Sequence, residues 1–215
     1  MAEIRWFGHN CFRIRAREAI VLMDPVGKKT GYSPSKQTAD IVTVSHKDPE
    51  SSNVQMVKPE YALIDGPGEY ELHDVFISGR RSYHDKVKGA ERGYNTIFEL
   101  DIDGLRIVHL GDLGHPLDDD SVEALSNIDI LFAPAGGGGG TTLSSSEVAE
   151  AVGNISPKMV IPMQYRTDKG DKNLEEVEAF CKHLGIEMPQ PVEKLTVKPS
   201  DLSDQMQLVL LRPES

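Results

Sequence analysis

The sequence contains few of the features that mark secreted or membrane-spanning proteins. It has only two cysteines, Cys11 and Cys181, which lie far apart, so a disulfide framework is not expected. No apolar run approaches the length of a membrane span, and the segment after Met1 lacks the apolar core of a signal peptide. We therefore expect a cytoplasmic protein.

Basic residues are also in the minority, with 23 Lys and Arg against 34 Asp and Glu and a net charge of −11. Nucleic-acid affinity depends mainly on basic side chains that neutralise phosphates, so nucleic acid is not an expected partner, and neither is an anionic membrane. The polar, basic stretch from Arg80 to Gly93 is an expected loop. It is either a solvated face or, beside a metal, a holder of an anionic substrate.

No motif for a phosphate-binding P-loop is present, because the glycine run from Gly136 to Gly140 is not followed by the required lysine. The backbone N–H groups of Gly137 and Gly138 are candidates for receiving a substrate oxyanion, and the alternative is a mobile lid. No Ser-His-Asp elbow or Cys-His pair is recognisable. The partner we expect is a small molecule, with an anion as one option, and homo-oligomerisation is left open.

A chain of 215 residues with 39% hydrophobic content can bury one good core, so residues 1–215 are predicted to form a single domain. The first half predicts strands, beginning with Arg5–Arg15 and Glu18–Leu22. The segment Gly27–Pro34 reads as a loop, either a flap over a site or a surface crossover. The second half adds predicted helices from Asp118 to Leu125, from Ser144 to about Asn154, and across Leu174 to Leu184.

Four apolar strands share a design, because each ends in polar residues or glycine. The strands end in His46, in Gly111-Asp112, in the glycine run, and in Gln164-Tyr165-Arg166. If they were aligned in one sheet, these residues would gather along one edge and form the site. After the first strand, His46, Asp48 and Glu50 are spaced two apart and could offer one nitrogen and two carboxylates to one ion, although a solvated turn has the same composition.

Several segments resemble, in the same order, those of the metallo-β-lactamase-fold hydrolases, in particular the small lactonase-like branch that includes ascorbate-6-phosphate lactonase. The matching segments are Trp6–Phe12, Leu22–Pro25, the loop from His46, Gly66–Glu71, Tyr83–Asp85, His109–Asp112 and Val160–Tyr165. The resemblance implies an α/β fold of the four-layer αββα sandwich type. It also exposes departures, because Asp48, Glu50, Ser51 and Gln164 stand where the family has histidine, aspartate, histidine and histidine.

Carried across residue by residue, the resemblance implies a first metal position with His46, Asp48, His84 and Asp112. The second position keeps Glu50 and Asp112 but gains Ser51 and Gln164, which are weak ligands for a transition metal. We therefore expect at most one well-held ion, with zinc first, manganese or iron as alternatives, and an empty site as the remaining option.

Other candidate residues lie near these positions in the sequence. His9, which the resemblance places near the site, and Asp24, at a strand end, would orient the ligands from behind, and the alternatives are a tucked, hydrogen-bonded histidine and a turn cap. Glu50 or Asp112 is a candidate proton acceptor, and His115 is a candidate replacement ligand or acid. Gly137, Gly138 and Arg166 are candidates for substrate binding. The predicted function is a metal-dependent hydrolase of a small phosphorylated or lactone-type substrate. The alternative is a catalytically silent relative that acts as a metabolite-binding or assembly module.

Overall fold

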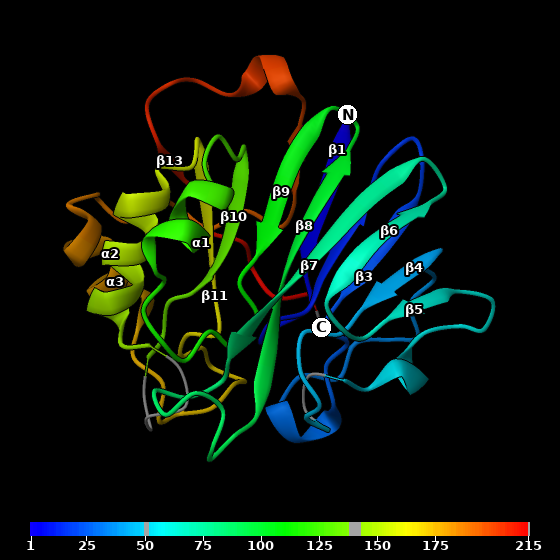
Figure 1. Cartoon of the computed structure of the whole chain (residues 1–215), viewed down its shortest axis with the longest axis horizontal. Helices are drawn as coiled ribbons and strands as arrows, with labels where there is room; N and C mark the ends of the chain where they lie inside the picture. Colours follow the sequence, from blue (N-terminus) through cyan, green and yellow to red (C-terminus); the bar gives the residue numbers. More distant parts are fainter. Residues whose placement is uncertain (50–51, 138–142, 215) are drawn as a thin grey trace.

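Two β-sheets packed face to face form the centre of the molecule in the computed structural model, which describes residues 1–49, 52–137 and 143–214 (Figure 1). The first sheet has six strands among these residues. Their spatial order is β12 (Leu195–Val197), β1 (Ala2–Trp6), β2 (Phe12–Arg15), β3 (Ile20–Met23), β4 (Ile41–Thr43) and β5 (Ala62–Ile64). β3, β4 and β5 run parallel, so their carboxyl ends lie at one edge.

The second sheet has seven strands within the described ranges. Their spatial order is β13 (Gln207–Leu208), β11 (Met159–Met163), β10 (Ile130–Pro134), β9 (Leu105–His109), β8 (Tyr94–Ile102), β7 (Val75–Tyr83) and β6 (Gly68–Leu72). β9, β10 and β11 are parallel neighbours, and β10 and β11 have the continuous apolar sequences that predict this arrangement. The expected gathering of strand ends is confirmed for these three strands, whereas β4 belongs to the other sheet.

The core between the sheets is built from the alternating inward side chains of both. Phe12 of β2 stacks on Phe132 of β10, with ring centroids 4.1 Å apart, and both side chains are fully buried. Such aromatic pairs contribute beyond the apolar area that they remove from water. This contact fixes one sheet on the other and thereby positions the two sets of strand ends.

Within the described ranges, three helices cover the outer face of the seven-stranded sheet, on the side of β10 and β11 (Figure 1). They are α1 (Asp119–Ala124), α2 (Ser145–Ile155) and α3 (Val177–Leu184). Asp118 caps α1, and Ser144 with Glu147 forms a capping box on α2, so the expected helix starts are confirmed. None of the helices in the described part of the chain has the length and apolar character needed to cross a membrane.

The outer face of the six-stranded sheet carries a second apolar cluster that includes Phe7, Leu22, Val42 and Met56. Among the described residues this face is covered by loops with the short 3-10 turns η1 (Lys28–Thr30) and η2 (Val54–Met56). A third turn, η3 (Pro199–Asp201), precedes β13. The expected four-layer sandwich is thus present, and the outer layer on the six-stranded sheet is made of loops with short 3-10 turns.

One strand prediction and one loop prediction were wrong in their extent. The run Arg5–Arg15 is split at residues 7–11, because Gly8 and His9 have φ angles of +92° and +48° and turn the chain between β1 and β2. The basic stretch predicted as a loop is strand up to Tyr83, since β7 pairs with β8 throughout. A polar residue such as Arg81 fits in this strand because its side chain faces solvent. Its guanidinium lies 4.8 Å from the ring centroid of Tyr94.

Candidate metal centre

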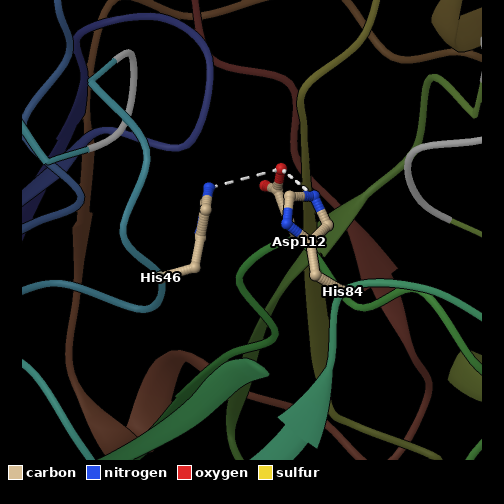
Figure 2. A group of neighbouring side chains, drawn as sticks. All are labelled: His46, His84 and Asp112. Atoms are coloured by element: carbon tan, nitrogen blue, oxygen red, sulfur yellow. Dashed lines mark ion pairs between the residues drawn. The ribbon is translucent and has the colours of Figure 1, made fainter. Parts of the chain in front are cut away.

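His46, His84 and Asp112 meet at the edge where strands of both sheets end. His46 follows β4 in the six-stranded sheet, whereas His84 follows β7 and Asp112 follows β9 in the seven-stranded sheet. Asp112 Oδ2 lies 3.5 Å from His46 Nε2 and 3.1 Å from His84 Nε2 (Figure 2). All three side chains are buried, and their ligand atoms lie within 4.8 Å of one another. This is the spacing of side chains that share one ion.

The backbone around Asp112 is fixed by the close approach of two other segments of the same chain. Gly111 has a φ angle of +59°, and a Cβ there would collide with Asn95 and Ser45. Asn95 Oδ1 accepts a hydrogen bond from Asp112 N at 3.0 Å. The side chain of Asn10 donates to Asp112 Oδ1, so that Oδ2 is the oxygen presented to the two histidines.

The orientation of His46 is set by a chain of hydrogen bonds that leads to Asp24. Asp24 accepts from the backbone N and from the hydroxyl of Ser45, at 2.7 and 2.5 Å. The Ser45 hydroxyl also lies 2.9 Å from His46 Nδ1, so it links this ring nitrogen to Asp24. A proton on Nδ1 leaves the lone pair on His46 Nε2, which faces Asp112, as a metal ligand requires. Asp24 therefore acts on the ligand through Ser45.

The charge state of the cluster suits a cation. Burial lowers the pKa of His46 below its usual value, so this imidazole is neutral at pH 7. Burial opposes ionisation of Asp112, but the nearby imidazoles of His46, His84 and His9 hold its pKa below the usual range. His84 Nε2 is buried and makes no geometrically good hydrogen bond among the described residues, although Asp112 Oδ2 lies 3.1 Å away. Imidazole nitrogens and an ionised carboxylate are ligands that fit a divalent transition metal.

The cluster lies on the wall of a cavity of about 360 Å³. The cavity is lined by His9, Lys29, Thr30, Gly31, His46, Asp48, His84, Arg92, Asp112, Gln164, Lys169, Gly170, Asp171 and Leu174. The segment Gly27–Pro34, which was predicted as either a flap or a surface crossover, contributes Lys29 to Gly31 to this lining. The loop after β11 contributes Lys169 to Leu174. The ligand cluster thus faces a small chamber that both loops help to enclose.

Not all of the candidate residues are brought together. His9 and Gln164 line the cavity, and the half-buried Asp48 does so outside the three-ligand group. Among the candidates, Glu50, Ser51 and Gly138 lie outside the described residues.

Three further candidates lie away from the cavity wall. His115 packs its ring on Tyr83, and its Nδ1 lies 2.7 Å from the carbonyl oxygen of Pro116. Arg166 pairs with Glu176 at 2.5 Å beside a different cavity. Gly137 is buried next to the start of α2. Their positions give no support to the roles predicted for them in catalysis and substrate binding.

Sequence reasoning missed two groups of residues. Asn10 was not singled out, because a buried amide within an apparent strand gives no signal of its contact with Asp112. Lys169 and Asp171 were missed although the charged, glycine-containing run from Thr167 to Lys172 follows the strand that ends in Gln164. That position, directly after a strand end at the expected site, is the signal that could have identified them.

Comparison with known proteins places this geometry in a family. Residues 3–164 match the family described as the β-lactamase superfamily domain. A Thermotoga maritima protein assigned as a Zn-dependent hydrolase of the metallo-β-lactamase superfamily is 31% identical in sequence and has a TM-score of 0.78. The match covers 99% of this chain and 100% of that protein. The chain belongs to the metallo-β-lactamase superfamily.

Other relatives within the superfamily are named UPF0173 metal-dependent hydrolases. The protein from Lysinibacillus sphaericus (strain C3-41) is 26% identical over 196 residues, which cover 77% of this chain and 86% of the relative. The protein from Staphylothermus marinus is 28% identical over 233 residues, which cover 94% and 98%. The narrower resemblance to the lactonase-like branch stays a prediction.

Proposed function

We propose that the chain is a metal-dependent hydrolase that uses one divalent ion held by His46, His84 and Asp112. The observation that carries this proposal is the convergence of three buried ligand atoms within 4.8 Å on a cavity wall. The names of the superfamily relatives agree with it. Two imidazoles and one carboxylate favour zinc, with manganese and iron as alternatives.

We propose a single ion, because the described residues hold no second cluster of three such ligands. Gln164, which stands where the resemblance places the last histidine, offers an amide. Amide oxygens suit hard cations better than zinc.

A divalent ion bound at this site would lower the pKa of a water molecule towards neutrality and polarise the oxygen of the scissile group. The residues of the chain supply the rest. Asp112 is a poor proton acceptor because its pKa is held below the usual range. We assign proton acceptance to Asp48, which lines the same cavity outside the ligand group. Asn10 and Ser45 hold Asp112 and His46 in place.

The substrate in this proposal is small and anionic, of the phosphorylated or lactone type. A cavity of about 360 Å³ admits only a small molecule. Lys29, Arg92 and Lys169 line it together with Asp48, Asp112 and Asp171, so a bound divalent ion would give the lining a net positive charge. The three basic side chains and the ion would attract an anion and keep it near the metal centre. Arg80, from the same basic stretch, lies on β7 and does not line the cavity.

Elemental analysis of protein purified without chelator tests the metal centre. We expect about one zinc per chain in the natural protein, none in His84→Ala, and one in His183→Ala, because His183 is exposed and far from the cluster in sequence. Two tightly bound ions per chain would contradict the single-ion proposal. Retention of zinc by the His84→Ala protein would show that the ligands are different.

Hydrolysis of a chromogenic phosphodiester and of a lactone tests the activity. Arg92→Gln should raise KM for the anionic substrate about tenfold, as expected for loss of one charged hydrogen bond, whereas Arg80→Gln should leave KM unchanged. Equal KM values for the two variants would argue against the proposed anion site. Binding without turnover by the zinc-containing protein would favour the alternative of a silent metabolite-binding module.

A further inference from the structure

Two side chains beside the candidate metal centre present polar atoms that lack partners in the described part of the chain. Gln164 is only 4% exposed, and its Oε1 has no hydrogen-bond partner among the described residues. His9 Nδ1 is also buried and unpaired within that part of the chain. Both residues line the cavity that holds His46, His84 and Asp112. Buried polar atoms in native proteins are nearly always paired, so a partner for these two atoms is expected from the cavity.

The backbone brings the two residues together and holds them. Gln164 N donates to the carbonyl oxygen of His9 at 3.3 Å, and the indole nitrogen of Trp6 donates to the same oxygen at 2.8 Å. His9 and Gln164 have φ angles of +48° and +51°, in the left-handed region that non-glycine residues adopt rarely. Such conformations cluster at ligand sites, where the surrounding structure enforces them.

The metal does not account for either unpaired atom. His9 is outside the group whose ligand atoms lie within 4.8 Å of one another, and the amide oxygen of Gln164 is a weak ligand for zinc. Thr43 provides a comparison, because its hydroxyl is also buried and unpaired among the described residues but does not line the cavity. The polar atoms of His9 and Gln164 differ from it in that a ligand can reach their cavity.

We propose that His9 and Gln164 form a subsite for a hydroxyl group of the substrate, so that the substrate carries a hydroxyl as well as an anionic group. The proposal rests on the proposed function, because it places the same substrate in the same cavity. An amide oxygen only accepts hydrogen bonds, whereas an imidazole nitrogen donates or accepts according to its tautomer. A hydroxyl can do both, so one hydroxyl or two neighbouring ones satisfy this pair. Lys29, Arg92 and Lys169 hold the anionic group.

Calorimetric titration of zinc-loaded protein with two matched ligands tests the subsite. Glycerol 3-phosphate and n-propyl phosphate have the same charged group and chain length but differ in their hydroxyls. We expect the natural protein to bind glycerol 3-phosphate about tenfold more tightly, since a neutral hydrogen bond has about this effect on affinity. Gln164→Met, which keeps the side-chain length, and His9→Phe, which keeps a planar ring, should each bring the ratio close to 1. Thr43→Val should leave the ratio unchanged.

Zinc content measured on the same samples separates the two proposals. Natural protein without zinc would contradict the metal-dependent function, whereas zinc-containing natural protein that binds both phosphates equally, or neither, would overturn the hydroxyl subsite alone. Loss of zinc from the Gln164→Met protein would also overturn the subsite, because it would make Gln164 a metal ligand. If that variant does not fold, the ratio for the natural protein still decides.

Discussion

His109 and Asp24 titrate in opposite senses as the protein is acidified. Burial lowers the pKa of His109 from 6.5 to about 4, and its two ring nitrogens are satisfied in the neutral form by Asn10 O and Gly111 N. Burial also raises the pKa of Asp24 from 3.8 to about 8, against the hydrogen bonds from Ser45. His109 Nδ1 and Asp24 Oδ2 are 3.8 Å apart.

The sign of each contribution follows from proton uptake by the folded and unfolded states. Between pH 6.5 and 4, His109 is protonated only in the unfolded chain, so acidification lowers the free energy of unfolding. Over the same range Asp24 is protonated only in the folded protein, so its proton uptake on acidification raises the free energy of unfolding. Each contribution is about 3 kcal/mol, from the 2.5 pH units of this window at about 1.4 kcal/mol per unit. The two contributions therefore cancel in the natural protein.

Replacing either His109 or Asp24 should reveal the contribution of the other residue to the pH dependence of the free energy of unfolding. In His109→Gln, which does not titrate but can both donate and accept, acidification from pH 6.5 to 4 should raise the free energy of unfolding by about 3 kcal/mol relative to the natural protein. In Asp24→Asn it should fall by about the same amount. Urea unfolding at several pH values, with chelator present throughout, measures both differences, and His183→Gln serves as the exposed control.

Parallel pH profiles for the natural protein and His109→Gln would refute this reasoning, because they would mean that His109 takes up its proton in the folded state. A shift in Asp24→Asn of the same sign as in His109→Gln would refute the opposed titration of the pair.

Three other perturbations address the site and the loops around it. Ser45→Ala should weaken zinc binding about 10- to 100-fold in competition with a chromogenic chelator, since it releases His46 Nδ1, and unchanged affinity would show that the hydrogen bond is not needed. Asp48→Asn should keep its zinc but lower kcat about 10²- to 10⁴-fold, and full activity would reject its role as proton acceptor. Gly31→Ala should lower the free energy of unfolding by more than about 1 kcal/mol, because its Cβ would collide with the carbonyl oxygen of Lys169, whereas Gly153→Ala has open space and should raise it. Equal effects of the two glycine substitutions would contradict the close approach of the loops.

Elements specified by local chemistry were predictable from the sequence. Asp118 and the Ser144–Glu147 box fixed the starts of α1 and α2, because a capping side chain acts within three residues of its own position. The continuous apolar sequences of β10 and β11 likewise indicated buried parallel strands.

Features that depend on distant contacts were not predictable in the same way. The left-handed turn at His9 interrupts a run that alternates like a strand, and it is stabilised by Trp6 and Gln164. For the metal centre, strand ends indicated His46 and Asp112, but His84 came only from resemblance to the family. Its place beside Asp112 depends on how β7 pairs in the sheet, which no local pattern states.

The division of the ligands between the two sheets has a consequence for assembly. His46 belongs to the six-stranded sheet, and His84 and Asp112 belong to the seven-stranded sheet, so an ion held by all three would cross-link the two halves of the sandwich. High-affinity metal uptake then has to follow docking of the sheets. Metal would slow their separation, so amide hydrogen exchange in β4 and β9 should slow together when zinc is added.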